Sequence, residues 1–233
     1  MNMSDQAGLR RQMVETCREM TRIGINQGTA GNLSVRHGDG LLITPSSLPY
    51  DRMQPGDIVE MRMDGGFEGR RPSSEWRFHR DILVSRPDAN VVLHCHSVHA
   101  TSLACHMRPI PAFHYMVAVA GGADIRCSDY ATFGTQALSD AALVALDGRM
   151  ACLLGHHGQI ALGSDFAGAL WLAIEVETLA RMYLAALVLG EPPVLPVAEI
   201  DRVIEQIRRM GYGRPPNDEP VAPRASLPAG GHA

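Results

Sequence analysis

The stretch of residues 33–45, LSVRHGDGLLITP, contains two short runs of alternating side-chain character, and a third run, DIVEMRM, follows at residues 57–63. Gly, Asp and Pro bound these runs. A period of two is typical of β-strands that bury one face, and short runs bounded by turn residues favour antiparallel pairing. The three runs therefore predict strands of an antiparallel sheet.

Other patterns surround these strands. Helical spacing or capping residues predict helices over residues 8–23, 75–85, 136–147, 165–189 and 197–210, while apolar runs predict a strand over 91–96 and a strand–turn–strand over 151–163. A loop-rich stretch is expected in between, up to residue 132. No internal repeat or linker is present. We therefore predict an α/β fold: a single domain, residues 1–213, with a mostly antiparallel central β-sheet flanked by helices. The tail, residues 214–233, is rich in Pro, Gly and Ala and is expected to be disordered.

The composition of the 233-residue chain is that of a globular protein, 45% hydrophobic and 20% charged. Its formal net charge is −4 and it has no basic run, which argues against a nucleic-acid partner. No stretch approaches the roughly 20 apolar residues of a membrane span, and the first residues lack the apolar core of a signal peptide. Five cysteines without a C-x-x-C pair make a disulfide framework unexpected. We expect a soluble, cytoplasmic protein that binds no membrane.

The motif His94-Cys95-His96 ends the apolar run VVLHCH. Residues i and i+2 of a strand share one face, so His94 and His96 can present two imidazoles to one metal ion while Cys95 turns to the opposite layer. A bare H-x-H is also compatible with two ordinary polar residues at the end of a strand. Further ligands are needed to decide between these interpretations.

His156 and His157 lie between the apolar runs ACLL and QIAL, where an imidazole is costly without a partner. Adjacent residues diverge, so only one of the two is expected to join the same ion, and the local pattern does not say which. Glu75 stands at a predicted helix start, one turn before His79. Three imidazoles with a carboxylate or water form the open, tetrahedral arrangement typical of catalytic zinc. His99, His106 and His114 are expected to be supporting or structural.

Three donor-rich segments suggest an anion site. They are the turn at residues 29–32, the turn at residues 44–47 and the helix start at Ser73-Ser74. Free backbone N–H groups and the positive end of a helix favour an anion, and hydroxyl groups add donors. Taken alone, each segment is more often a plain turn or cap than an anion site. Together, in an acidic chain, they favour one phosphate pocket made of neutral donors.

These residues belong to longer blocks that resemble the class II aldolase/adducin family. The blocks, in order, are NQGTAGNLSVR, LLITPSSLPYD, PSSEWRFH, SRPDANVVLHCHSVH, IPAFHYMVAVAGG, YATFGT, LLGHHGQIAL and ALWLAIEVETLA. The resemblance as a whole spans residue 10 to about residue 212. The resemblance implies a class II aldolase that cleaves a ketose 1-phosphate between C3 and C4, giving dihydroxyacetone phosphate and an aldehyde. L-Fuculose 1-phosphate, 5-deoxyribulose 1-phosphate and 5-(methylthio)ribulose 1-phosphate are the candidate substrates.

The resemblance also implies a homotetramer with active sites at subunit interfaces, and a zinc ion, or manganese or cobalt, held by three histidines. The third ligand is then His157, the second histidine of the HHG block. Glu75 matches the acid/base carboxylate of the family, which also reaches the metal when substrate is absent. Tyr115 matches a tyrosine that reaches the neighbouring subunit's site, and Phe133 an aromatic near the aldehyde. The implied phosphate donors are Gly31, Asn32, Ser46, Ser47, Ser73 and Ser74.

Two positions depart from the family pattern. Relatives carry Thr-Gly in place of Ser46-Ser47, a mild change, and a tyrosine before the glycine that ends the last helix, where this chain has Met210. A thioether there makes the aldehyde end of the site more apolar, unless Tyr212 replaces the missing hydroxyl.

Other enzymes with the same scaffold are alternatives. An epimerase typically has aspartate at the position of Glu75. A dehydratase or decarboxylase resembles this chain less well in the sequence blocks around Tyr115 and Phe133. The complete set of metal and acid/base residues argues against a non-catalytic, adducin-like interaction module.

Overall fold

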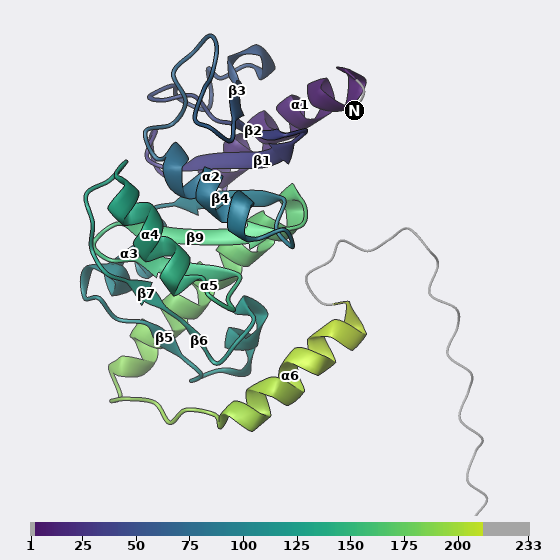
Figure 1. Ribbon diagram of the computed structural model, residues 1–233. Coiled ribbons are helices and arrows are strands. Elements are labelled where there is room, and N and C mark those ends of the chain that lie inside the picture. The colour runs from purple at the N-terminus through teal and green to yellow at the C-terminus, as the bar shows by residue number, and fades with distance from the viewer. Residues whose placement is uncertain (1–2, 212–233) are drawn as a thin grey trace, which may run out of the picture.

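The computed structural model describes residues 3–211 and, as predicted, has one central, mostly antiparallel sheet flanked by helices (Figure 1). The order of its seven strands is β3-β2-β1-β4-β9-β8-β7. All neighbours are antiparallel except β7 and β8, which run parallel. The strands are β1 (Asn32–His37), β2 (Gly40–Ile43), β3 (Val59–Arg62), β4 (Val91–Cys95), β7 (Cys127–Ser128), β8 (Ala151–Leu154) and β9 (Gly158–Gly163). The predicted tail, residues 214–233, lies outside the described residues.

Helices cover both faces of the sheet. On one face lie α1 (Met3–Arg22), α3 (Val98–Cys105) and α5 (Phe166–Leu187), and on the other lie α2 (Trp76–Ser85) and α4 (Gln136–Ala145). Successive strand residues enter opposite cores: Leu93 and Cys95 of β4 pack with α3 and α5, whereas Val92 packs with α2 and α4. The alternation therefore places His94 on the α2 side, and it confirms that Cys95 turns into the other layer.

The predicted loop-rich region is the part of the chain in which the expectation was wrong. It contains α3, the short helix η2 (Tyr115–Ala120) and the two-residue strands β5 (Ile110–Pro111), β6 (Asp124–Ile125) and β7. Helix α3 lacks a side-chain cap from its own N-terminal residues. Instead, the Glu177 carboxylate of α5 accepts the backbone N–H groups of His99 and Ala100 at 2.9–3.1 Å. This cap comes from a residue 78 positions away, so no local pattern announces the helix.

The last described helix, α6 (Val197–Met210), packs against η2 beside the main body (Figure 1). Its contact is a small third core of Ala112, Ala118 and Ile200. A short helix η1 (Pro55–Asp57) completes the elements of the described chain. Among residues 3–211, no helix is long and apolar enough to cross a bilayer.

Candidate active site

Three histidines that are far apart in sequence meet at the end of the central strands. The ring centroids of His94, His96 and His157 are 4.8–4.9 Å apart, and one nitrogen from each ring lies within 4.8 Å of the others. His94 is on β4, His96 directly follows that strand, and His157 lies in the turn between β8 and β9. Because β9 pairs with β4 in the register His94–Ile160 and Cys95–Gln159, the turn is carried to the end of β4.

The backbone of the turn selects between the two adjacent histidines. His156 has a left-handed φ of 55°, and its ring lies against Tyr130, at 5.8 Å between the ring centroids, rather than in the cluster. His157 then faces His94 and His96. This choice depends on one dihedral angle, which explains why the strand pattern left both residues open.

Glu75 completes the cluster from the opposite side. It occupies the N-cap position of α2, where its side chain makes no capping hydrogen bond, and it is 5% exposed. Its Oε2 lies 3.2 Å from His94 Nε2, and its Oε1 lies 3.2 Å from His157 Nε2. Oε1 accepts no hydrogen bond from the described residues, although it is buried. A buried carboxylate oxygen without a donor is costly, so this atom calls for a cation or a proton.

Burial keeps the imidazoles neutral. It lowers the pKa of His94 to about 3, with a further decrease from nearby His96, and it lowers the pKa of His157 to about 4, with a further decrease from nearby His94. Burial also lowers the pKa of His96, against the opposing effect of Glu75. Metal ions bind neutral imidazole, so the three rings are in the form that a metal ligand needs.

The tautomer of His94 further favours a cation. Its Nδ1 lies 2.9 Å from the backbone oxygen of Gln159, which can only accept, so Nδ1 carries the proton. The Nε2 lone pair of His94 then faces His96 Nε2 at 3.1 Å and the Glu75 carboxylate. Lone pairs that converge in this way repel one another unless a cation lies among them. The donor set therefore fits a divalent metal ion.

The cluster opens into a cavity of about 370 Å³. The cavity is lined by Thr29, Ala30, Ser74, Glu75, His96, Tyr130, Ala131, Phe133, His156 and His157. Its lining thus includes the candidate anion donor Ser74 and the aromatic side chains of Tyr130 and Phe133. Tyr130 and His156 were not among the predicted site residues, because an isolated tyrosine in a loop and a histidine beside a stronger candidate give no distinct signal.

The predicted anion segments lie side by side. Residues Pro45 and Pro72 form an antiparallel bridge, the Ser46 N–H donates to Arg71 O at 2.9 Å, and the Ser73 N–H donates to Thr44 O at 3.0 Å. This bridge brings the turn with Ser46 and Ser47 next to Ser73 and Ser74. The third segment is tied to the cluster by close contact, since a Cβ on Gly31 would lie 2.7 Å from His94 O.

Of the predicted site residues, five line this cavity: Ser74, Glu75, His96, Phe133 and His157. The others are not among its lining residues, and two of these, Tyr115 and Met210, lie in a different part of the molecule. Tyr115 begins η2 and is 49% exposed, and Met210 ends α6 and is 65% exposed. Both belong to the part of the molecule where α6 packs on η2. Two of the histidines that were expected to be supporting or structural also lie outside the cluster. His99 bonds to Glu177 at 2.6 Å, and His114 accepts from the Met116 N–H at 3.3 Å.

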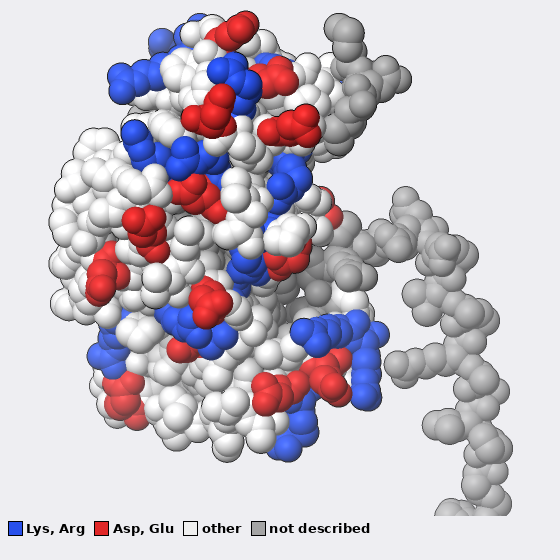
Figure 2. All heavy atoms as spheres, in the orientation of Figure 1, with Lys and Arg blue, Asp and Glu red and all other residues white. Residues whose placement is uncertain are grey.

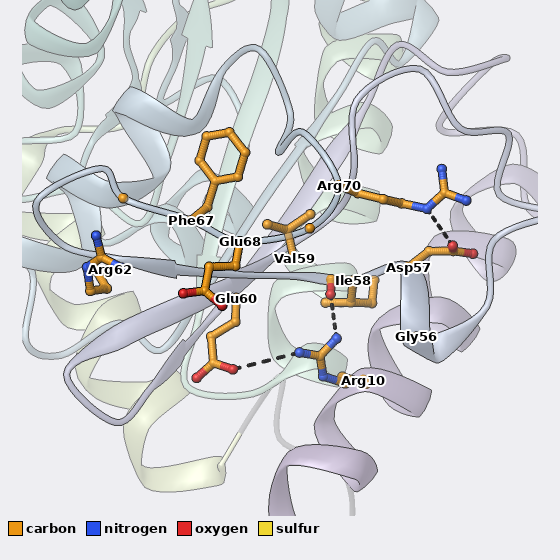
Figure 3. Close-up of a pocket in the computed structure, with 12 residues that line it drawn as sticks. Arg10, Gly56, Asp57, Ile58, Val59, Glu60, Arg62, Phe67, Glu68 and Arg70 are labelled. Atoms are coloured by element: carbon orange, nitrogen blue, oxygen red, sulfur yellow. Dashed lines mark hydrogen bonds and ion pairs between the residues drawn. The ribbon is translucent and has the colours of Figure 1, made fainter.

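A second cavity of about 400 Å³ lies at the outer edge of the sheet, beside β3 (Figure 3). Its three arginines are already paired: Arg10 bonds to Ile58 O and faces Glu60, Arg62 pairs with Asp64, and Arg70 contacts Asp57 at 2.7 Å. Charges of both signs are likewise interspersed over the face in Figure 2. We therefore place the chemistry at the histidine cluster.

The chain is similar to known proteins in both sequence and structure. A family model described as "Class II Aldolase and Adducin N-terminal domain" matches residues 11–184. The chain is 55% identical over 204 residues to the 5-methylthioribulose-1-phosphate/5-deoxyribulose-1-phosphate aldolase of Rhodospirillum rubrum, covering 87% of this chain and 92% of the relative. It is 52% identical over 205 residues to the L-fuculose phosphate aldolase of Escherichia coli K12, covering 87% and 95%. A solved structure of an L-fuculose 1-phosphate aldolase superposes with a TM-score of 0.85 at 37% identity, covering 89% and 98%.

The chain therefore belongs to the class II aldolase and adducin family. The relatives are named as aldolases, which are lyases, and this chain is a class II aldolase as well. Class II aldolases depend on a metal ion, and the histidine triad is the group of described residues that offers a site for one.

The glycine after His157 gives a first prediction. A Cβ on Gly158 would lie 2.6 Å from Cys95 O and 2.8 Å from His96 Cδ2, so Gly158→Ala must displace β4 or a proposed ligand. We expect the unfolding free energy to fall by about 1–3 kcal/mol and metal affinity to fall with it, because overpacking shifts the triad. Denaturant unfolding and metal titration measure both. Gly56→Ala is the control, because a Cβ there meets nothing within 4 Å. Unchanged metal affinity in Gly158→Ala would contradict this account.

Proposed function

We propose that the chain cleaves a ketose 1-phosphate between C3 and C4 into dihydroxyacetone phosphate and an aldehyde. The observation that carries the proposal is the buried Glu75 Oε1. This oxygen accepts no hydrogen bond from the described residues, and it stands beside three neutral imidazoles at a cavity that the candidate phosphate donor Ser74 also lines. A base, a metal site and a phosphate site at one cavity are what a metal-dependent aldol cleavage requires.

His94, His96 and His157 would hold the metal, with Glu75 beside them. We propose zinc, because three imidazoles with one open position are typical of catalytic zinc, while manganese and cobalt accept the same ligands. When bound, the ion supplies Lewis-acid stabilisation of the negative charge that develops on the dihydroxyacetone phosphate fragment.

Glu75 is the proposed proton-transfer group. Cleavage leaves a carbanion at C3 of the dihydroxyacetone phosphate fragment, and this carbon must receive a proton. Of the two carboxylate oxygens, Oε2 accepts from Asn32 Nδ2 at 2.9 Å, whereas Oε1 is free of hydrogen bonds from the described residues. Oε1 is therefore the oxygen that delivers the proton in cleavage and removes it in the reverse direction.

The phosphate is proposed to bind at the paired turns. Its donors are Gly31, Asn32, Ser46, Ser47, Ser73 and Ser74. The Asn32 amide gives one N–H to Glu75 and has a second N–H to offer. The donors are neutral, and the N-terminal end of α2 adds its dipole, so the pocket can hold a phosphate without a paired cation.

The aldehyde is proposed to lie near Phe133, with Tyr115 and Met210 supplied by a neighbouring subunit of a homotetramer. In the single chain the two residues are exposed and belong to the packed pair of η2 and α6. Their placement away from the cavity of their own chain is what such sharing between subunits requires. Tyr115 would then handle the proton of the C4 hydroxyl. Tyr212 lies outside the described residues.

The test is a product assay with purified, metal-loaded protein. L-Fuculose 1-phosphate, 5-deoxyribulose 1-phosphate and 5-(methylthio)ribulose 1-phosphate are supplied separately, and dihydroxyacetone phosphate is measured. Release from at least one of them is the expected result. Loss of water, loss of CO₂ or inversion at C4 without carbon–carbon cleavage would instead assign a dehydratase, decarboxylase or epimerase, and no turnover of any sugar phosphate would favour an adducin-like module.

Substrate preference is expected to depend on Met210. A thioether packs against methyl and thioether groups but donates no hydrogen bond. We therefore expect kcat/KM for the 5-deoxy and 5-methylthio compounds to match or exceed that for L-fuculose 1-phosphate. Met210→Tyr should shift the ratio towards the fuculose compound by about tenfold, as expected for one added donor. Met210→Leu, which keeps an apolar side chain, should leave the ratio unchanged. A wild-type preference for fuculose that Met210→Tyr does not alter would show that Met210 has no part in selection.

A further inference from the structure

A row of buried polar side chains leads from the interior to Glu75. The Ser34 hydroxyl lies 2.7 Å from His79 Nδ1, His79 Nε2 lies 2.5 Å from Asn32 Oδ1, and Asn32 Nδ2 lies 2.9 Å from Glu75 Oε2. Each of these four side chains belongs to a residue that is at most 5% exposed. No step of the proposed reaction uses Ser34 or His79.

The periodicities of two elements build this row. Asn32 and Ser34 are two apart on β1 and therefore share the face that looks towards α2. Glu75 and His79 are four apart at the start of α2 and therefore share one side of that helix. The two pairs interdigitate in the order Ser34, His79, Asn32, Glu75. Because Asn32 is the register partner of His94, the row runs next to the metal cluster.

Hydrogen-bond chemistry gives the row one direction. The Glu75 carboxylate only accepts, so the Asn32 NH₂ group must face it and the Asn32 oxygen must face His79. His79 must then carry its proton on Nε2, and its unprotonated Nδ1 accepts from the Ser34 hydroxyl. Burial lowers the pKa of His79 well below the usual range, and nearby His94 adds to this effect, so the ring is neutral and has a single tautomer.

The consequence is that the two oxygens of Glu75 are not equivalent. Oε2 is fixed by Asn32, and Asn32 is itself held by His79. Within the described part of the chain, Oε1 accepts no hydrogen bond, and it is the oxygen close to His157. A carboxylate with one oxygen bonded and the other unbonded cannot rotate without losing the Asn32 bond.

We propose that Ser34, His79 and Asn32 are positioning residues that hold Glu75 by Oε2 and leave Oε1 free for proton transfer. The proposal rests on the proposed function, in which Glu75 transfers the proton. His79 acts only through Asn32 and touches neither substrate nor metal. Removing it should therefore lower the rate of proton transfer while metal content and the KM for dihydroxyacetone phosphate stay close to those of the wild type.

The experiment measures exchange of the C3 proton of dihydroxyacetone phosphate with D₂O, catalysed by the zinc-loaded full chain without aldehyde. His79→Leu removes both hydrogen bonds, and the exchange kcat should fall about 10- to 100-fold, as for other groups that orient active-site residues. The KM should stay within about threefold of the wild-type value, and the bound zinc within about 20%. A positioning residue lowers metal affinity when it supports a metal ligand, and His79 supports none of the three histidines. His79→Gln offers a donor and an acceptor again, and it should recover most of the lost rate.

Two further variants separate positioning from general damage to the core. Ser34→Ala removes only the end of the row and should lower the exchange kcat about 2- to 10-fold, the effect of one hydrogen bond. Ser139→Ala is the matched control: its buried hydroxyl donates to Asp81 at 2.7 Å, on the same helix α2, but outside the row. We expect Ser139→Ala to exchange at the wild-type rate. Ser34→Ala also carries the kinetic test if His79→Leu does not fold.

A measurement independent of activity is the tautomer of His79, obtained from long-range ¹H–¹⁵N spectra of the labelled protein and assigned by the signal lost in His79→Gln. The expected form is Nε2–H. An Nδ1–H or doubly protonated His79 would overturn the proposal, and so would wild-type exchange rates in folded, zinc-loaded His79→Leu or Ser34→Ala. If the wild type itself exchanges no proton, the proposed function fails together with this proposal. If the wild type exchanges the proton and the variants exchange it equally fast, only the positioning proposal fails.

Discussion

The variant His96→Ala is expected to lose its metal ion and, with it, aldol cleavage. The wild type should hold about one zinc per subunit, and the variant less than about one tenth of that, because a catalytic site with three protein ligands cannot keep the ion with two. Cleavage should fall by at least about 10³-fold, since the same ion stabilises the developing charge. Elemental analysis after gel filtration, together with a coupled assay of dihydroxyacetone phosphate, measures both quantities.

The matched control for this variant is His106→Ala. His106 is an exposed histidine directly after α3, and it lies outside the cluster, so metal content and turnover should match those of the wild type. Retention of a full zinc equivalent in His96→Ala would show that the metal is held elsewhere and would remove the basis of the histidine assignment.

The second large effect is expected from Glu75→Gln. The amide oxygen can accept from Asn32 in place of Oε2, which leaves the NH₂ group at the position of Oε1. An amide there can neither take nor deliver the proton. We expect kcat for cleavage and for exchange of the C3 proton to fall by about 10²- to 10⁴-fold, the usual contribution of one acid/base group. Zinc content should remain close to one equivalent, because the three imidazoles are intact.

Glu60→Gln is the control for this variant, because Glu60 lies on β3 at the outer edge of the sheet and pairs with Arg10 rather than with the cluster. It should retain wild-type rates. Turnover of metal-loaded Glu75→Gln within threefold of the wild type would assign the proton to another group, and the cavity offers His156 and Tyr130 as the next candidates.

Much of the sheet and the centre of the site follows from simple periodicity. The alternation in VVLHCH was sufficient to predict that His94 and His96 share a face and that Cys95 does not, and the structure confirms that Cys95 lies in the opposite core. The strand–turn–strand around His156 and His157 was equally visible, because its two apolar runs flank a polar turn. These predictions depend on local backbone geometry, which the local sequence dictates.

The parts that could not be predicted depend on distant partners. Helix α3 is capped by Glu177, and the choice of His157 over His156 depends on one left-handed residue. The partnership of His79 with Asn32 requires knowing that β1 lies under α2. The spacing of Asn32 and Ser34, and that of Glu75 and His79, is visible in the sequence. Until the topology is known, however, the sequence does not say which helix or strand each pair packs against.

The pairing of β4 with β9 has a consequence for the order of events during folding. A segment of about 60 residues separates Cys95 on β4 from its register partner Gln159 on β9, and the proposed ligands lie at both ends of this segment. The third imidazole therefore joins the other two only when β4 and β9 pair. Closing such a loop is a slow, non-local step. We therefore expect the metal to bind after this pair has formed, when the scaffold is almost complete. An ion held by residues of both strands would tie them together, and we expect its main kinetic effect to be slower unfolding rather than faster folding.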